Sequence, residues 1–133
     1  MSLENGSGNA IFKNATSLTS FSMSGTMTES ICEGCTSLKY VDVNASTIPY
    51  RSFYGCTSLT AVNFKQTVTA IGSEAFAKCS ALSSISLSST TINAVHRDFI
   101  SGTAITSIML PAAIDDLSKL DQNAFRGSKL TKV

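Results

Sequence analysis

The stretch Phe53-Tyr-Gly-Cys56-Thr-Ser-Leu59-Thr-Ala-Val62-Asn-Phe64 decides the fold, because its pattern returns along the chain. The next copy reads Phe76-Ala-Lys-Cys79-Ser-Ala-Leu82-Ser-Ser-Ile85-Ser-Leu87. Both follow the form F-x-x-C-x-x-L-x-x-I-x-L, with like residues exchanged at the apolar positions. A regular repeat of this kind indicates one structural unit stacked on itself.

Each copy can be anchored on one leucine or isoleucine. The anchors are Leu18, Leu38, Leu59, Leu82, Ile105 and Leu130. Their spacing of about 20 to 25 residues is the range of leucine-rich repeats. Apolar residues stand three and five positions after each anchor, although the last copy ends before its final position. This alternation predicts a short strand with one buried face in each copy.

Upstream of the anchor the apolar period changes to three, which predicts a short helical or 3₁₀ turn. Six positions before the first five anchors stand Phe12, Cys32, Phe53, Phe76 and Phe99, the Phe slot of each copy. Phe125 lies only five before its anchor, so the last copy carries a one-residue deletion. Two positions after the Phe slot stand Asn14, Gly34, Gly55, Lys78, Ser101 and Gly127. We expect the left-handed backbone at this position, since glycine and asparagine tolerate it.

The predicted fold is an α/β solenoid of about six leucine-rich repeats. Short parallel strands should form the concave side, short helical or 3₁₀ turns the convex side, and the coil should be right-handed. We assign residues 10–133 to this domain and residues 1–9 to a leader or linker. Neither end shows the polar cap that a solenoid needs, so we expect a fragment of a longer repeat protein, or an end covered by another subunit in end-to-end self-association.

The stretch from Ile71 to Leu87 resembles the BspA-type leucine-rich repeat pattern almost position for position, and Leu110-Pro111 keeps the trailing proline of that pattern. The resemblance covers about residues 10 to 133. Departures are Cys32 in a Phe slot, Gly102 in a Cys slot and the shortened last copy. The resemblance implies a secreted or surface protein of a microbe, of the kind described as adhesins for host matrix or other cells. That family shares no catalytic residues.

Composition narrows the classes of function. The formal net charge is +1 and only 14% of residues are charged, which argues against nucleic-acid binding, because that needs a basic stripe. No apolar run approaches the roughly 18 residues of a spanning helix, so no membrane insertion is expected. No signal peptide stands at the start.

The cysteines invite a redox or zinc interpretation at Cys32-Glu-Gly-Cys35, but their repeat positions favour another. Cys35, Cys56 and Cys79 share one position of the repeat, where a small buried residue fits. Cys32 replaces a phenylalanine and should also point inward. We therefore predict four free, buried thiols, since a reactive thiolate needs exposure and nearby positive charge, and the two C-x₂-C pairs of a zinc site are absent.

Other candidate sites are weak. His96, the only histidine, stands at a variable position three before Phe99 and should be exposed. A calcium cluster and a hydrated acidic loop are the two interpretations of Asp115, Asp116 and Asp121, and the EF-hand spacing is missing. Glycosylation sequons begin at Asn5, Asn14 and Asn44, and chance alone produces a similar number. We identify no catalytic constellation, metal site or cofactor motif.

Two surfaces are candidates for binding a partner. On the concave side, the outward positions of neighbouring strands bring together Tyr40, Asp42 and Asn63, with Lys39 and Thr60 on the rim. Aromatic residues beside polar ones are common in binding hot spots; a plain solvated sheet is the alternative. The second candidate lies on the convex side and consists of Tyr50, Arg51 and Tyr54, where Tyr50 has the alternative of packing against a neighbouring coil.

The sequence therefore predicts a non-enzymatic protein-binding module of a secreted or cell-surface leucine-rich repeat protein. By the resemblance, its partner is a protein of the host matrix or of another cell. The alternative is a set of spacer repeats that carries another functional domain. An enzyme is disfavoured because the usual site signals are missing.

Overall fold

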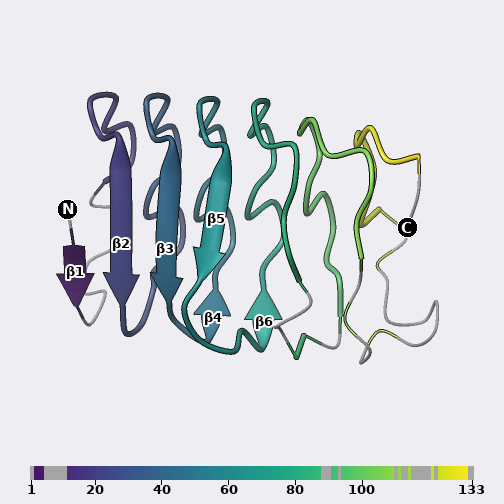
Figure 1. The fold of residues 1–133 in the computed structure, drawn as a ribbon, viewed down its shortest axis with the longest axis horizontal. Helices are drawn as coiled ribbons and strands as arrows, with labels where there is room; N and C mark the ends of the chain where they lie inside the picture. Colours follow the sequence, from purple (N-terminus) through teal and green to yellow (C-terminus); the bar gives the residue numbers. More distant parts are fainter. Residues whose placement is uncertain are drawn as a thin grey trace.

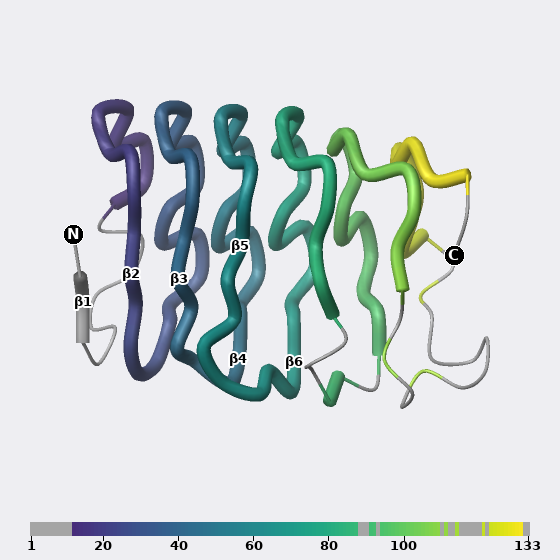
Figure 2. The backbone as a smooth tube through the Cα atoms, viewed as in Figure 1, coloured from purple at the N-terminus to yellow at the C-terminus, as the bar shows by residue number. Residues whose placement is uncertain are grey.

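A computed structural model of the protein describes residues 2–4, 12–87, 91–92, 94–109, 111, 114, 121 and 123–131, with residues 2–4 described for their backbone only. The chain winds into coils that lie side by side along one axis, with strand β1 at one end and the coil of residues 123–131 at the other (Figures 1 and 2). The repeat of the sequence is thus a repeat in space.

One face of the stack is a parallel sheet. Its strands are β1 (Ser2–Glu4), β2 (Ser20–Ser24), β3 (Tyr40–Asn44) and β5 (Ala61–Phe64), in that order across the sheet. Residues 2–4 fall in the segment expected to be a leader or linker, and they pair in parallel with β2. Strands β4 (Thr47–Ile48) and β6 (Ala70–Ile71) form a second, two-stranded parallel sheet. Equivalent positions of successive repeats therefore lie opposite one another.

The alternation predicted from the sequence is confirmed in β2 and β3. Phe21, Met23, Val41 and Val43 are buried, whereas the residues between them are not. The same positions of the fourth and fifth repeats, Ile85, Leu87 and Ile108, are buried too. The described residues around Ile85, Leu87 and Ile108 do not form strands. Burial of the apolar side chains thus follows the repeat further along the chain than the sheet does.

The opposite face, which we call the turn face, differs from the sequence prediction. No helix occurs among the described residues; hydrogen-bonded turns replace it. In the third repeat, Tyr54 N–H bonds the Arg51 carbonyl and Cys56 N–H bonds the Phe53 carbonyl. Arg51 (φ 53°) and Gly55 (φ 73°) both adopt the left-handed conformation, which interrupts a right-handed helix. The segment of each repeat in which apolar residues recur every three positions therefore consists of separate tight turns.

Backbone hydrogen bonds also join the turns of successive coils. Phe53 N–H donates to the Ala75 carbonyl at 2.9 Å, and Gly55 N–H donates to the Ala77 carbonyl at 2.9 Å. Because the donors reach the next coil, the polar backbone of the turn face is satisfied without a helix. Right-handed coiling and a concave sheet side remain predictions.

These bonds correct the predicted alignment of the fifth repeat. Phe76 N–H donates to the Phe99 carbonyl, and Lys78 N–H donates to the Ser101 carbonyl. In the preceding coils, each of these amides bonds the carbonyl of the residue just before its own equivalent in the next coil. By the same rule, Ile100 is equivalent to Phe76, and Gly102 is equivalent to Lys78. Ile100 therefore occupies the Phe slot, and Gly102 (φ 74°) the left-handed position. Thr103, fully buried, replaces the cysteine. The one-residue deletion affects the fifth repeat as well as the sixth.

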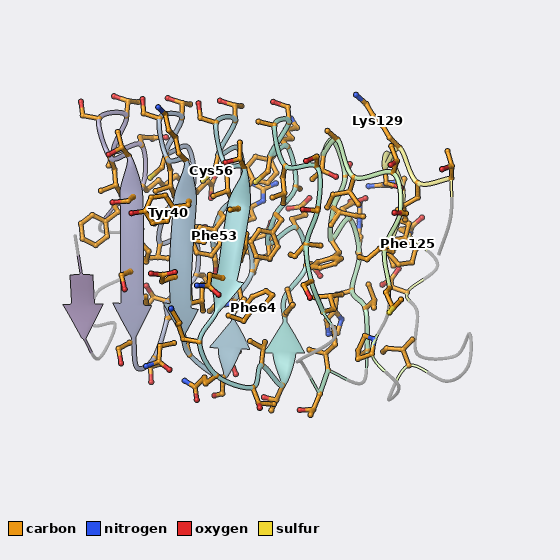
Figure 3. The ribbon with its side chains drawn as sticks, viewed as in Figure 1. Tyr40, Phe53, Cys56, Phe64, Phe125 and Lys129 are labelled. Carbon is orange, nitrogen blue, oxygen red and sulfur yellow. The ribbon has the colours of Figure 1, made fainter. Side chains whose placement is uncertain are left out.

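The core fills the space between the two faces. The rings of Phe53 and Phe76 stack with centroids 5.5 Å apart, and Phe99 meets Phe76 edge-on at 6.0 Å. Phe53 and Cys56 are both fully buried (Figure 3). A single coil could not bury these side chains, but stacked coils share one continuous core.

Candidate functional site

The sheet brings together all five residues of the predicted concave-side site. We call them the sheet-face patch: Lys39, Tyr40, Asp42, Thr60 and Asn63. Strands β3 and β5 are neighbours, and their register places Asp42 directly opposite Asn63. The Asn63 amide Nδ2 donates to the Asp42 carboxylate Oδ1 at 3.1 Å. This cross-strand bond fixes both polar groups on the outer face of the sheet.

Tyr40 gives the sheet-face patch its exposed aromatic surface (Figure 3). Its residue is 53% exposed, although it begins a strand in the middle of the sheet. On the next strand it faces Ala61, whose side chain is too small to cover a ring. Asp42 takes part in none of the ion pairs found between described side chains. The patch thus combines an open aromatic ring with a carboxylate held by an amide.

The rim of the patch is also ordered. The Lys39 carbonyl accepts both the Thr60 N–H at 2.8 Å and the Thr60 hydroxyl at 3.1 Å. The Thr60 hydroxyl is therefore directed toward the backbone, while the exposed Lys39 side chain lies at the edge.

Beyond the patch, the outer face of the sheet side carries mostly small hydroxyl groups. Ser84 and Ser107 are exposed, and Met109 is 76% exposed. A shallow hollow is lined by Ser84, Ile85, Ser86, Leu87 and Met109. These residues offer few groups that could distinguish one ligand from another.

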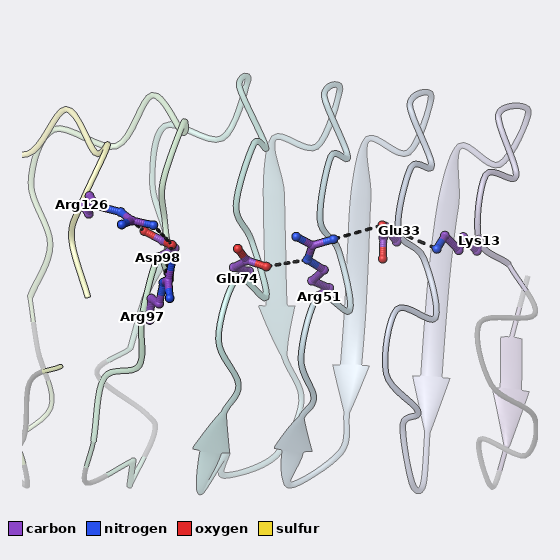
Figure 4. Close-up of polar contacts among 7 residues, drawn as sticks. All are labelled: Lys13, Glu33, Arg51, Glu74, Arg97, Asp98 and Arg126. Atoms are coloured by element: carbon purple, nitrogen blue, oxygen red, sulfur yellow. Dashed lines mark hydrogen bonds and ion pairs between the residues drawn. The ribbon is translucent and has the colours of Figure 1, made fainter. Parts of the chain in front are cut away.

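The second predicted surface is also assembled. Arg51 lies over the Tyr54 ring at 4.2 Å from its centroid and over the Tyr50 ring at 5.3 Å. Its Nε donates to the Glu74 carboxylate at 2.5 Å, and Glu33 lies 3.8 Å from its Nη1. Figure 4 shows this row of alternating charges continuing to Lys13 across successive coils. Cations on aromatic faces, paired with carboxylates, hold the row in place.

These contacts shift the titration of the groups involved. The Arg51 guanidinium beside Glu74 lowers the pKa of that carboxyl below its ordinary value. Desolvation is the largest cause of the raised pKa of Tyr50. Glu33 and Glu74 were not predicted as partners of Arg51. Glu33 occupies a different position of the repeat, whereas Glu74 occupies the same position as Arg51 one coil later, so alignment of the two repeats could have paired Arg51 with Glu74.

A third charged cluster was missed by sequence reasoning. The Asp98 side chain is only 6% exposed. Its carboxylate accepts Arg126 Nε at 3.0 Å, Arg126 Nη2 at 2.6 Å and Arg97 Nε at 3.1 Å (Figure 4). The bond with Arg126 is the largest cause of the lowered pKa of Asp98. Asp98 and Arg126 come from neighbouring coils and occupy different positions of the repeat, so the repeat pattern alone does not pair them.

The cysteine positions agree with the prediction of core packing. All four cysteines are fully buried free thiols. The thiols of Cys35, Cys56 and Cys79 donate to the carbonyls of Phe12, Cys32 and Phe53, each one coil earlier. The shared position therefore supplies a donor as well as a small volume.

The thiols influence one another in pairs. Hydrogen bonding with Cys35, together with burial, raises the pKa of Cys32, and hydrogen bonding with Cys79 raises that of Cys56. Hydrogen bonding from Cys32 lowers the pKa of Cys35, but its full burial keeps reagents away.

The remaining predicted residues fall as follows. His96 is exposed, as predicted. Asn14 and Asn44 are exposed; Asn5 lies outside the described residues. Asp121 is exposed, and Asp115 and Asp116 lie outside the described residues. No group of three or more histidine, cysteine or acidic side chains that could hold a metal occurs in the described part of the chain. None of its segments forms a helix long and apolar enough to cross a bilayer.

Comparison with known proteins agrees with this architecture. The model of the BspA type leucine rich repeat region matches six copies over residues 6–132. No curated protein matches the chain. A crystal structure of a leucine-rich repeat protein from Bacteroides ovatus ATCC 8483 is similar in fold, with a TM-score of 0.59 and 22% sequence identity. The similarity covers 99% of this chain and 42% of that protein, so the chain spans less than half of its length. The chain belongs to the BspA-type leucine-rich repeat family.

Proposed function

We propose that this chain is a non-enzymatic binding module that holds a protein partner on the sheet-face patch. The observation that carries the proposal is the exposed Tyr40 ring beside the fixed Asp42–Asn63 pair. Tyrosine supplies a large contact area at a small cost in conformational entropy, and it is enriched in binding hot spots. The amide and carboxylate supply directed hydrogen bonds.

Rigidity of the patch supports the same conclusion. Asp42 and Asn63 stand on paired strands, and their side chains already bond each other. Little ordering is then needed when a partner docks, so more of the contact energy appears as affinity. Because Asp42 lacks an ion pair among the described residues, a partner that brings a lysine or arginine to it gains a charge-assisted hydrogen bond.

We further propose that the module acts outside the cell, on a microbial surface or in secreted form, and adheres to host matrix or to other cells. This part rests on membership of the BspA-type family. The repeat array provides a broad, regular surface, which suits contact with another protein better than enclosure of a small substrate.

The test is a binding screen of the chain against immobilised matrix proteins (collagen, fibronectin and laminin) and intact host cells. The double variant Tyr40→Ala/Asp42→Ala should weaken any saturable binding about tenfold or more. The matched control is Ser84→Ala/Ser107→Ala, two exposed positions on the same side of the solenoid. Equal thermal melting of both variants would show that the fold is intact. Equal binding by both would remove the sheet-face patch from the proposal.

The second candidate is a spacer that holds another domain away from the cell. The hydroxyl-rich sheet surface around Ser84 and Ser107 favours it, because such a surface offers little to recognise. A spacer predicts no saturable binding to any protein or cell in the same screen.

A further inference from the structure

A hollow on the turn face, away from the sheet-face patch, is lined by Tyr50, Ser73, Glu74 and Arg97. The backbone bonds from Arg51 to the Ser73 carbonyl and from Glu74 to the Arg97 carbonyl make Tyr50, Ser73 and Arg97 equivalent positions of three successive coils. The hollow exists because a serine stands between two large side chains. Its floor is the serine, and its two walls are an aromatic ring and a guanidinium.

The size of the hollow follows from the stacking of the coils. Parallel neighbours lie about 4.8 Å apart, so the backbones that carry Tyr50 and Arg97 are separated by roughly 10 Å. Gly72 keeps the coils close beneath the hollow, since a Cβ at that residue would lie 2.6 Å from the Tyr50 backbone nitrogen. The space above Ser73 is therefore one coil wide, which suits a single ring-sized group.

The walls are accessible and chemically different. Tyr50 is 41% exposed, and the Arg97 side chain is 56% exposed. The Glu74 carboxylate is held by Arg51, which fixes its position and compensates its charge. A ligand here would meet an aromatic ring, a hydroxyl, a fixed carboxylate and a guanidinium.

The charges around the hollow favour an anionic group at the Arg97 wall. Asp98 is the carboxylate that pairs with both Arg97 and Arg126. Arg126 alone already makes two bonds to it. One carboxylate between two guanidiniums leaves one positive charge in excess. An incoming carboxylate can pair with Arg97 in the geometry that guanidinium groups prefer.

We propose that this hollow binds one carboxylate-bearing sugar residue of a polysaccharide or glycan. The apolar face of the sugar ring packs on Tyr50, its carboxylate pairs with Arg97, and its hydroxyls bond Ser73 and Glu74. A sugar acid fits better than an acidic peptide side chain, because it offers a ring face and several hydroxyls as well as the charge. This site is independent of the protein-binding proposal and lies on other residues.

The test is isothermal titration of the chain with three probes: hexagalacturonate, a hyaluronan hexasaccharide and sialyllactose. At least one should bind, and Arg97→Gln should weaken it about tenfold or more, as loss of a charge-assisted pair predicts. The Ser73→Tyr variant should abolish binding by filling the hollow while leaving every charge in place. It should fold, since the equivalent position one coil earlier already carries Tyr50.

Three controls test whether binding depends on this hollow and on the charge of the ligand. Glu29→Gln alters the same repeat position one coil before Tyr50, outside the hollow, and should leave binding unchanged. Tyr40→Ala, on the sheet-face patch, should also leave sugar binding unchanged. Where hexagalacturonate binds, its methyl ester should bind about tenfold more weakly. Absence of binding to all three probes, or binding that survives Ser73→Tyr in a folded variant, would overturn the proposal; equal binding of acid and ester would overturn the role of Arg97.

Discussion

The Cys79 thiol donates a hydrogen bond to the carbonyl of Phe53, one coil earlier in the stack, at 3.1 Å. The same relationship links Cys56 with Cys32. The cysteine at this position therefore ties each coil to its neighbour and also fills a small volume of the core. Thr103, the equivalent residue of the fifth repeat, fills the same buried position, but its hydroxyl donates to the Ile100 carbonyl of its own coil at 2.9 Å.

Replacement of Cys79 should weaken the fold measurably. Cys79→Ala removes the sulfur from a fully buried site and leaves the Phe53 carbonyl without this donor, which should cost about 1–2 kcal/mol of unfolding free energy. Urea denaturation measures the change. The matched control is Ser80→Ala at the next, exposed position, which should stay within about 0.5 kcal/mol of the parent. Identical stability of the two variants would contradict a structural role for the thiol.

Stability should fall in alkaline solution because of Cys56. Its hydrogen bond with Cys79 and its burial raise its pKa in the folded state above that of the unfolded chain. The contribution of the protonated thiol is complete below the unfolded pKa of about 8.5 and is lost as the pH rises above it. Urea unfolding at pH 7 and pH 10 should show a smaller difference for Cys56→Ala than for the parent. An equal difference in both chains would exclude Cys56 as its source.

Acid should weaken the fold through Asp98. Arg126 and Arg97 lower its pKa in the folded state, so the carboxylate contributes stability above its unfolded pKa of about 3.9. That contribution is lost as the pH falls through the lower, folded pKa. Asp98→Asn should reduce melting temperature at pH 7 and flatten its decline between about pH 5 and pH 2. The exposed Asp121→Asn is the control; a decline unchanged by Asp98→Asn would place the acid sensitivity elsewhere.

The alignment of the fifth repeat can be tested with two neighbouring substitutions. Gly102 adopts φ 74°, and a Cβ there would lie 3.3 Å from the Lys78 Cα. Gly102→Ala should therefore cost about 1–2 kcal/mol. Ser101→Ala should be close to neutral, because the left-handed position is not at Ser101. Thermal or urea melting decides between them, and the reverse order of stability would restore the alignment predicted from the sequence.

Much of the fold could be predicted from the sequence because each repeat position demands one kind of side chain. Asp42 and Asn63 were expected to lie side by side since they share a position in neighbouring repeats. The fifth repeat misled this reasoning because Phe99 and Ile100 are both large and apolar, so a one-residue deletion left the apolar pattern intact. The hydrogen bonds between coils reveal this one-residue shift of the alignment, and they cannot be read from the sequence.

Contacts between charged side chains of successive coils were the second limit. Arg51 meets Glu33 and Glu74, and Asp98 meets Arg126, through side chains that cross from one coil to the next. Their geometry depends on the left-handed turns at Arg51 and Asp98. Periodicity gives the spacing of such residues, and it does not give the direction of their side chains.

The central claim is that equivalent residues of successive coils stack in parallel, and NMR detection of couplings across backbone hydrogen bonds tests it most directly. The structure predicts a coupling from the Phe53 amide to the Ala75 carbonyl, from Thr60 to Lys39 and from Phe76 to Phe99. Couplings that pair these amides in an antiparallel order, or that join Phe76 to Asp98 instead of Phe99, would contradict the stacking and the alignment described above.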